Sequence, residues 1–581
     1  MTSKSLISEA ISKKIGAIIL LSFTILAATV SKIAMAFIFQ HIIDSVLPMT
    51  PDQNPPLGLW VGFFVLALLT GFMLDLANHN QATDLGTYVT SSLSKAVYSA
   101  GMRAEYGEIQ KFQSEELVKK TTGDCEKIGL EYIGKNWTGF LKEIIVLVSL
   151  FTAMMIIVPL WGLITFIALP LFYMAIHGLE KYILRLNWDE QQELQVRAKR
   201  VSESFTKIRG IKLDNGITRE EDEFNRLTDA CIKKHQHVAT LRNLFDRGLI
   251  DLFVGLIIAV ILGIGGYLTI QSGMEATIGR VASFVIMIPF AYLSFRKLML
   301  VKIRPANIAA ELKSLDQVFT LRSEAKSEPI TNLEEVLSLK FSNVSYFGSS
   351  AEENLEGISF ELKRGEKLGI LSYEAASRDL MFDLVTKLIR PRDGVISINN
   401  CDLNKMNTFY LRDIITAVPQ EISLMDDTIA NNITYPMAFD EYKYNDALNR
   451  SGLKDILSTL ENKDQTRIDK NSQFSNDFRQ RIVLANAFYK DSKIFVLNEA
   501  TSYLDVRSEE AIMKEFYKLK NKIAIVMSDK VYNILNCDKV LIISEGRVLE
   551  YGKVQDLLQN KDSEFNRMIK KVKTTRIAKV S

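Results

Sequence analysis

The longest uncharged run of the sequence is Ile144–Leu179, IIVLVSLFTAMMIIVPLWGLITFIALPLFYMAIHGL. It contains no Asp, Glu, Lys or Arg over 36 residues. A helix needs only about 20 apolar residues to cross a membrane, so this run is long enough for two crossings. It therefore predicts a hairpin of two membrane-spanning helices that turns near Pro159.

Further apolar runs lie on both sides of this hairpin, all within the first 300 residues. They are Ile15–Ile43, interrupted by Lys32, and then Pro56–Leu74, Leu252–Met274 and the shorter Val281–Phe295. Any one of them could be a buried core helix, but five such runs together favour a membrane protein. Lys32 is expected either to pair or to extend its ammonium toward the interface, and contact with a substrate is the alternative. We predict a transmembrane domain over 15–322, with spans at about 15–43, 56–77, 138–158, 160–179, 249–274 and 278–301.

The distribution of charge predicts the orientation of these spans. The connections Ser45–Leu57 and Gln271–Thr277 contain no Lys or Arg, whereas Lys4, Lys13 and Lys14 precede the first span. Because cytoplasmic segments carry the excess of Lys and Arg, both termini are expected in the cytoplasm. The long charged segments 78–136 and 180–247 are expected as helices that continue out of the membrane. The sequence thus predicts a multi-pass protein of the cytoplasmic (inner) membrane, preceded by an amphipathic segment, 1–14, that lacks a signal-peptide pattern.

The amino-acid composition excludes several classes of protein. The 581 residues include 70 Lys+Arg and 68 Asp+Glu, giving a formal net charge of +2, which excludes a bulk nucleic-acid binder. With 48% hydrophobic residues the chain can build large cores. The four cysteines are far apart and have no metal-ligand spacing, so we expect free thiols and predict no metal site.

The sequence changes character after about residue 322. Short β-type segments, such as Leu337–Tyr346 and Lys367–Leu371, alternate with helical ones, such as Ser377–Ile389 and Phe478–Tyr489. This alternation predicts an α/β domain with a mainly parallel sheet. We expect a linker at 323–333, the α/β domain at 334–566, and an unpacked basic C-terminal tail at 567–581.

One stretch of this domain, Phe474–Asp505, is FSNDFRQRIVLANAFYKDSKIFVLNEATSYLD. It resembles the signature-to-D-loop stretch of ATP-binding cassette (ABC) exporters, whose pattern is LSGGQRQRhxhARAhhxxPxhhhhDEATSxLD with h apolar. Gln420 lies in a segment that resembles the family's Q-loop, and Ser502 and Asp505 lie in the D-loop. Glu116–Ile128 and Ile208–Leu213 resemble the cytoplasmic helical extensions of the membrane half. The resemblance covers nearly the whole chain and implies six spans followed by a P-loop-like nucleotide-binding domain, which is half of a transporter.

The phosphate-binding loop of this family departs from its pattern. Such a loop needs G-x-x-x-x-G-K-[ST], so that backbone N–H groups, the lysine and the hydroxyl hold phosphates and Mg²⁺. Here the glycine positions carry Ser372, Ala375 and Ser377, the lysine position Arg378 and the hydroxyl position Asp379. A carboxylate about 4 Å from a phosphate, at an effective dielectric near 20, is repelled by roughly 4 kcal/mol. A Mg²⁺ ion bound to Asp379 would relieve that repulsion, and this alternative stays open.

Other positions implied by the resemblance are altered as well. Asn498 replaces the Mg²⁺-binding Asp, and Asp529 replaces the switch His, whereas Glu499 keeps the place of the catalytic carboxylate. Without a phosphate nearby, a structural role is expected for Glu499. The glycine-rich signature LSGGQ becomes Phe474, Ser475, Asn476, Asp477 and Phe478.

The family resemblance and these substitutions lead to one main hypothesis. The chain is predicted to be a non-catalytic (pseudo-ATPase) subunit of a heterodimeric ABC exporter, inactive as an ATPase alone. ATP and Mg²⁺ would be bound mainly through a partner half transporter with intact motifs. Two alternatives remain: a non-transporting membrane scaffold or regulator, and a subunit that binds ATP without hydrolysing it. The sequence does not identify the transported substrate.

Overall fold

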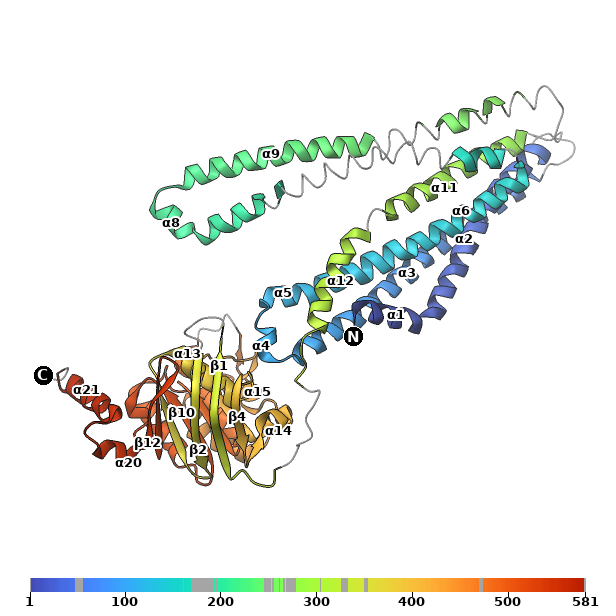
Figure 1. Ribbon diagram of the computed structural model, residues 1–581. Helices are drawn as coiled ribbons and strands as arrows, with labels where there is room; N and C mark the ends of the chain where they lie inside the picture. Colours follow the sequence, from blue (N-terminus) through green and yellow to red (C-terminus); the bar gives the residue numbers. More distant parts are fainter. Residues whose placement is uncertain are drawn as a thin grey trace. The chain divides into compact units, whose positions relative to one another are not determined.

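The computed structural model describes residues 2–46, 56–159, 161–168, 193–194, 196–244, 252, 255–260, 262–264, 267, 278–302, 305–324, 333–348, 354–469 and 474–578. Two compact units share the chain. The helical unit comprises Met1–Ser99 and Ser114–Thr320, and the sheet unit comprises Ala100–Gln113 and Leu321–Ser581. Figure 1 shows long helices in the first and a sheet covered by helices in the second. Most of the expected linker at 323–333, residues 325–332, falls outside the described residues.

Four helices of the described residues are long and apolar enough to cross a membrane. They are Ile15–Val46, Leu57–Met102, Ser114–Ile157 and Ile278–Leu298. The apolar part of α3 (Leu57–Met102) leaves most of its side chains exposed, among them Leu59, Phe63 and Phe72. A soluble core helix would bury such side chains, so this exposure fits a helix that faces lipid. The other two expected spans, 160–179 and 249–274, lie largely outside the described residues.

The core of the helical unit is a bundle of three of these helices. α2 (Ile15–His41), α6 (Thr138–Ile157) and α11 (Ile278–Lys302) pack against one another. Their buried faces meet in one apolar cluster, which includes Ile25, Leu150 and Phe284. The expected amphipathic start of the chain forms a helix, α1 (Ser3–Lys13), whose first residue donates its backbone N–H to Asp316 of α12 (Pro305–Phe319) at 2.7 Å.

The cytoplasmic extensions are mostly helical where the structure describes them. η3 (Lys120–Asp124) and η4 (Lys127–Trp137) are π-helical and precede α6 directly. α8 (Ile208–Leu213) lies at the end of a long hairpin whose return arm is α9 (Ile217–Asn243), as Figure 1 shows. The segments that resemble exporter extensions are therefore helical.

The sheet unit is built on a ten-stranded sheet with the order β5-β4-β1-β2-β12-β11-β3-β10-β9-β6. Its strands are β1 (Ser338–Phe347), β2 (Asn354–Lys363), β3 (Lys367–Leu371), β4 (Asp393–Ile398), β5 (Cys401–Asp402), β6 (Ile415–Val418), β9 (Ile494–Asn498), β10 (Ile523–Ser528), β11 (Lys539–Ser544) and β12 (Arg547–Lys553). β7 (Asp427–Thr428) and β8 (Arg467–Ile468) form a separate pair.

The expectation of a mainly parallel sheet needs correction, because the sheet is mixed. β11, β3, β10, β9 and β6 form a parallel block, while β1 pairs antiparallel with both β2 and β4. The difference has a local cause. β1–β2 and β11–β12 are consecutive strands with short connections, and such connections favour antiparallel pairing, whereas parallel neighbours need a crossover.

Alternate residues of the central strands enter two different cores. Ile494 and Val496 of β9 belong to a cluster shared with α13 (Ala375–Val385) and the antiparallel strands. Phe495 and Leu497 of the same strand belong to a cluster shared with α18 (Asn476–Lys490) and α19 (Val506–Tyr517). Burial on both faces explains why these strands are continuous apolar runs in the sequence.

Further helices complete the sheet unit. They are α14 (Thr408–Ile414), α15 (Ile429–Thr434), α16 (Glu441–Arg450), α17 (Lys454–Ser458), α20 (Val554–Gln559) and α21 (Glu564–Ala578). The expected boundary at residue 566 falls inside α21. Phe565 and Ile569 of this helix are buried against Leu371 and Val531. The start of the expected tail, 567–581, is therefore packed rather than free.

A short segment of the membrane half belongs to the sheet unit. Ala100–Gln113, which contains α4 (Tyr106–Ile109), is held by an ion pair of 2.7 Å between Glu105 and Arg390. The Glu105 N–H also donates to the Arg322 carbonyl at 2.8 Å. Glu324 in turn accepts two hydrogen bonds of 2.9 Å from Arg412. This bidentate geometry is the strong form of a carboxylate–guanidinium pair, so the segment is anchored by charge.

A glycine pair tests how the antiparallel part of the sheet is packed. Gly394 (φ +83°) and Gly365 (φ +89°) both adopt the left-handed region, but a Cβ on Gly394 would lie 2.2 Å from the Asn343 carbonyl oxygen. The nearest atom to a Cβ on Gly365 is 4.0 Å away. We expect Gly365→Ala to cost about 1 kcal/mol of unfolding free energy through backbone strain. Gly394→Ala adds steric overlap and should cost about 3 kcal/mol. Denaturant unfolding of the purified protein measures both, and equal losses would contradict the packing described.

Candidate functional site

The candidate site begins where the central strand β3 ends. β3 lies between β11 and β10 in the parallel block, so the segment that follows it, Ser372–Asp379, emerges at the carboxyl edge of the sheet. In open α/β sheets this edge is where ligands bind. α13 starts at Ala375 with Glu374 as its N-cap, and the Glu374 side chain makes no capping hydrogen bond. The strand–loop–helix frame of a phosphate loop is therefore present.

Arg378, at the lysine position, is turned into the protein. Its side chain is only 4% exposed, and its Nη1 donates to the carbonyl oxygen of Ser372 in the same loop. Its Nε lies 3.6 Å from Oε1 of Glu499, which is also buried. The guanidinium charge is thus compensated inside the domain. An arginine held in this way does not project from the loop as the family's phosphate-binding lysine must.

Asp379 and Asn498, at the two positions that would hold Mg²⁺, contact each other. Nδ2 of Asn498 donates to Oδ1 of Asp379 at 2.6 Å, while the buried Oδ1 of Asn498 has no hydrogen-bond partner. Burial raises the pKa of Asp379, although this hydrogen bond and the charge of Arg378 oppose the rise. The charge of Glu421 raises the pKa of Asp379 further.

Asp383, one turn further along α13, adds another carboxyl group. Burial, together with the charge of Asp379, raises the pKa of Asp383 to about 6. The neighbourhood of the loop is thus rich in acids that disfavour negative charge. No group of three His, Cys, Asp or Glu side chains suitable for a metal ion occurs among the described residues.

Glu374 places one more carboxylate at the start of α13. Its Oε2 accepts from the hydroxyl of Ser377 at 3.0 Å, and its Oε1 accepts from the backbone N–H of Glu545 at 2.9 Å. The N-terminus of a helix normally attracts an anion such as phosphate. Here a side-chain anion from the loop itself lies close to that position. The sequence analysis did not single out Glu374, although it lies within the phosphate-loop segment.

Glu499 is held by several contacts at the end of β9. Its backbone is left-handed (φ +46°), and its N–H donates to the carbonyl of Met527 at 3.0 Å. Its Oε1 accepts from the backbone N–H of Asp529 at 2.6 Å. Burial raises the pKa of Glu499, and the nearby Asp529 charge also raises it, while the Asp529 N–H and Arg378 favour the ionised form. The structure therefore brings Arg378 and the backbone N–H of Asp529 to the carboxylate of Glu499.

The signature segment Phe474–Phe478 begins α18 and contacts a different set of groups. Ser475 caps this helix by accepting from the N–H of Phe478 at 3.2 Å, and the rings of Phe474 and Phe478 lie 4.8 Å apart. Asp477 accepts from Nε of Arg481 at 3.2 Å, and Asn476 is exposed. Among the described residues, no hydrogen bond or ion pair joins Phe474–Phe478 to Ser372–Asp379.

The D-loop is tied to α18 and to α19. Gln480 of α18 donates to the carbonyl of Glu499 and accepts from the N–H of Tyr503 at 2.9 Å. Asp505 caps α19 by accepting from the N–H groups of Arg507 and Ser508. The hydroxyl of Ser502 is buried without a partner. Gln420 lies half-buried in the bend that follows β6.

Glu509 is a second buried carboxylate, which the sequence analysis missed. It is 1% exposed and accepts from Thr501 at 2.8 Å and from Asn533 and Tyr532 at 2.9 Å. Burial alone would raise the pKa of Glu509, but these hydrogen bonds and Lys530 outweigh burial and lower it. The Glu509 network joins the D-loop turn to the segment after Asp529. Only the three-dimensional contacts distinguish this residue from other glutamates of α19.

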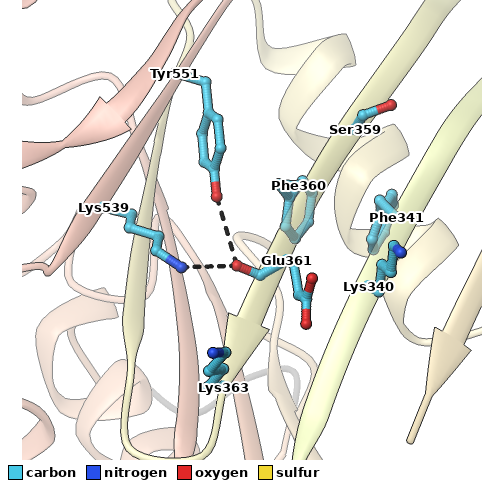
Figure 2. Close-up of a pocket in the computed structure, with 8 residues that line it drawn as sticks. All are labelled: Lys340, Phe341, Ser359, Phe360, Glu361, Lys363, Lys539 and Tyr551. Carbon is cyan, nitrogen blue, oxygen red and sulfur yellow. Dashed lines mark hydrogen bonds between the residues drawn. The ribbon is translucent and has the colours of Figure 1, made fainter. Parts of the chain in front are cut away.

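A hollow of about 370 Å³ in the sheet unit lies apart from the phosphate-loop segment. Figure 2 shows it on β1, β2, β11 and β12, with Lys340, Lys363 and Lys539 among its lining residues. Lys539 donates to the carbonyl of Glu361 at 2.9 Å and pairs with Glu366 at 2.8 Å. No residue of Ser372–Asp379 lines this hollow, so it is not part of the candidate nucleotide site.

Comparisons with known proteins agree with this architecture. Residues 18–293 match the family model described as ABC transporter transmembrane region, and residues 355–502 match the one described as ABC transporter. A "Putative export ATP-binding/permease protein" of Rickettsia bellii is 22% identical over 558 residues, which are 94% of this chain and 95% of that protein. An "ATP-dependent lipid A-core flippase" of Legionella pneumophila is 22% identical, with 84% of each chain covered.

Other relatives and a solved structure extend this result. A "Beta-(1-->2)glucan export ATP-binding/permease protein" of Bartonella bacilliformis is 24% identical, covering 93% of this chain and 90% of that protein. The structure of a bacterial Atm1-family ABC exporter with ATP bound superposes with a TM-score of 0.78 at 19% identity. That similarity covers 96% of this chain and 98% of the other, and it concerns the fold.

The buried Arg378–Glu499 pair can be tested by a double-mutant cycle. Removing one partner of a buried ion pair leaves an uncompensated charge, which typically costs about 3 kcal/mol or more. We expect Arg378→Ala to destabilise the protein by about that amount, and Glu499→Gln to restore part of the loss when combined with it. Chemical denaturation of the two single variants and the double variant measures the coupling. Strictly additive losses would show that the two side chains do not interact.

The acidic neighbourhood predicts a dependence of stability on pH. Because folding raises the pKa of Asp383 to about 6, the folded state holds a proton that the unfolded chain has already lost. The contribution of Asp383 to stability is therefore greatest below about pH 4 and declines as the pH rises through 6. We expect Asp383→Asn to raise the melting temperature at pH 7.5 and to have a smaller effect at pH 5. Asp393→Asn, at an exposed position of β4, is the matched control. A pH-independent effect of Asp383→Asn would refute the assignment.

Proposed function

This chain belongs to the ATP-binding cassette transporter family, as an exporter-type half transporter with a membrane domain fused to a nucleotide-binding domain, and we propose that it is a non-hydrolysing subunit of a heterodimeric exporter. In this proposal a partner half transporter with intact motifs binds ATP and Mg²⁺ and hydrolyses the ATP. The present chain supplies the other half of the translocation pathway. It moves together with the partner and does not itself turn over nucleotide.

The observation that carries the proposal is the buried pair between Arg378 and Glu499. In the family these two positions have different roles in ATP hydrolysis. The lysine at the position of Arg378 holds phosphate, and the glutamate at the position of Glu499 polarises the attacking water. Here each satisfies the charge of the other. An arriving triphosphate would have to break this pair and leave the carboxylate uncompensated, which is strongly unfavourable in a buried site.

The carboxylates around the loop support the same conclusion. Glu374 lies at the start of α13, where the β-phosphate of a bound nucleotide is expected, and Asp379 replaces the Mg²⁺-binding hydroxyl. Asp379 is itself engaged by Asn498. The residues present at Ser372–Asp379 therefore do not fit Mg-ATP, and we derive no catalytic step through it.

The altered signature segment, Phe474–Phe478, supports a partner other than a second copy of this chain. In the family, the signature of one subunit faces the nucleotide held by the other. Asp477 lies in the first turn of α18 and pairs with Arg481, so this chain would present a carboxylate where glycine allows close backbone approach. Two copies of this chain would then combine defective phosphate loops with defective signatures. The contacts of Gln480 and Glu509, which hold the D-loop in place, are intact and support a role in dimer contact.

The direction of transport is proposed by analogy. Relatives are named for export and for flipping of lipid A-core, and in this chain the membrane region precedes the nucleotide-binding domain. We propose export toward or across the outer face of the membrane, with a substrate whose identity the described residues do not specify.

ATP turnover by the purified chain tests the proposal. We expect no hydrolysis above background and no change on Glu499→Gln. We also expect no labelling by a photoreactive ATP analogue that unlabelled ATP can compete away. The matched positive control restores the phosphate-loop pattern through Ser372→Gly, Ala375→Gly, Ser377→Gly, Arg378→Lys and Asp379→Ser, and should gain labelling. Family-typical hydrolysis that Glu499→Gln abolishes would overturn the proposal.

Affinity purification from native membranes then separates the remaining alternatives. Recovery of a stoichiometric half transporter with intact motifs supports the heterodimer. Recovery of a different enzyme or channel instead favours a scaffold or regulator. Competed labelling without hydrolysis would indicate a subunit that binds ATP without using it.

A further inference from the structure

A cavity of about 360 Å³ opens in the helical unit between α2, α3, η4 and the start of α6. Its apolar lining includes Leu21 and Ile25 of α2. Its polar lining includes Lys142 of α6, Lys135 and Glu131 of η4, and Asn78 of α3. A cavity lined by both kinds of side chain suits a ligand that has an apolar part and a charged head.

The charge of the polar lining and its ion-pair partners is positive overall. Lys142 pairs with Asp75 at 2.8 Å, and Lys32 pairs with the other oxygen of the same carboxylate at 2.6 Å. One negative charge thus compensates two ammonium groups, while Glu131 offsets Lys135. Lys32 is therefore paired, with Asp75, and the trio retains a charge of +1. An ammonium with an unsatisfied charge at a membrane boundary attracts an anion.

Asn78 supplies a second, independent feature of the cavity. Its side chain is 3% exposed, and its Oδ1 lies 2.5 Å from the hydroxyl of Thr24. Its Nδ2 is buried and has no hydrogen-bond partner. An unsatisfied buried amide costs about 1–3 kcal/mol, so an oxygen of a ligand bound here would remove a penalty that the protein alone bears.

The wall formed by η4 is irregular in a way that creates this space. η4 is π-helical from Lys127 to Trp137, and π-helical turns occur frequently at functional sites. Its Gly134 packs so closely on α3 that an added Cβ would lie 3.2 Å from Cα of Gly86. By contrast, a Cβ added to Gly139, which also lines the cavity, would meet no atom within 4 Å. The helices thus touch on one side of the cavity and separate on the other.

The sequence places the cavity at the membrane boundary. Lys142 and Glu143 immediately precede the uncharged run from Ile144, and Asn78 follows the uncharged run that ends at Leu74. Leu21 and Ile25 lie within the first apolar run. With the expected orientation, the cavity lies at the cytoplasmic leaflet, where anionic lipids are concentrated.

We propose that this cavity binds the anionic headgroup of a membrane phospholipid, with Lys142 and Asn78 contacting the phosphate and Leu21 and Ile25 packing against an apolar part of the lipid. The proposal goes beyond the transport function and does not depend on how this chain handles ATP. It concerns occupancy of the cavity by lipid, whether that lipid is transported or retained.

Lipid retention by the purified full-length chain tests the site. The protein is reconstituted in nanodiscs of phosphatidylcholine with a minor fraction of phosphatidylglycerol, released into detergent, and analysed by native mass spectrometry. We expect one retained phosphatidylglycerol per chain. Lys142→Gln and Lys135→Gln should each weaken retention about fivefold, the equivalent of about 1 kcal/mol per cation. Lys95→Gln, at an exposed position of α3 outside the cavity, is the matched control and should have no effect.

Gly139→Phe provides a charge-neutral test, because its side chain has open space beside the cavity. We expect it to abolish retention while the melting temperature stays unchanged. Equal retention of phosphatidylcholine and phosphatidylglycerol would overturn the proposal. So would retention that Lys142→Gln, Lys135→Gln and Gly139→Phe all leave intact. Displacement of the lipid by millimolar glycerol 3-phosphate alone would also overturn it, because the site would then bind a free anion.

Discussion

The ion pair between Arg378 and Glu499 governs the arrangement around the carboxyl edge of the central sheet. It joins the loop after β3 to the end of β9, and β10 lies between these two strands. Both side chains are buried, so each charge is stable only because the other is present. The Glu499 carboxylate also accepts from the N–H of Asp529, which links the end of β10 to the same point. Three neighbouring strand ends are thereby fixed by contacts among protein groups.

The apolar cores of the nucleotide-binding domain do not depend on these charged contacts. The parallel block and its two apolar cores do not require a bound phosphate, because β9 and β10 are buried on both faces. Gln480 and Glu509 hold the D-loop through hydrogen bonds that are independent of the phosphate-loop segment. The residues that form the sheet and its apolar cores are therefore distinct from the side chains at Ser372–Asp379.

The helical unit uses charge in a comparable way at the membrane boundary. Asp75 binds two lysines from two other helices, so a single carboxylate fixes the relative positions of α2, α3 and α6. In both units a buried or half-buried acid is compensated by basic side chains from distant parts of the chain. In the nucleotide-binding domain one guanidinium faces one buried carboxylate. In the membrane domain the compensation is incomplete and leaves positive charge facing a cavity.

The sequence by itself determined the features that depend on residues close together in the chain. These are the apolar runs, the alternation of strands and helices after residue 322, and the substitutions at Ser372–Asp379 and Phe474–Phe478, because hydropathy, periodicity and motif spacing are local. The tertiary structure alone decided that Arg378 meets Glu499, that Asn498 meets Asp379, and that Lys32 and Lys142 share Asp75. It also decided that β1 pairs antiparallel with the distant strand β4, which the pattern of the strands does not contain. Each of these contacts joins residues tens to more than a hundred positions apart. Packing of whole elements creates such contacts, because only the folded chain brings residues from distant positions together.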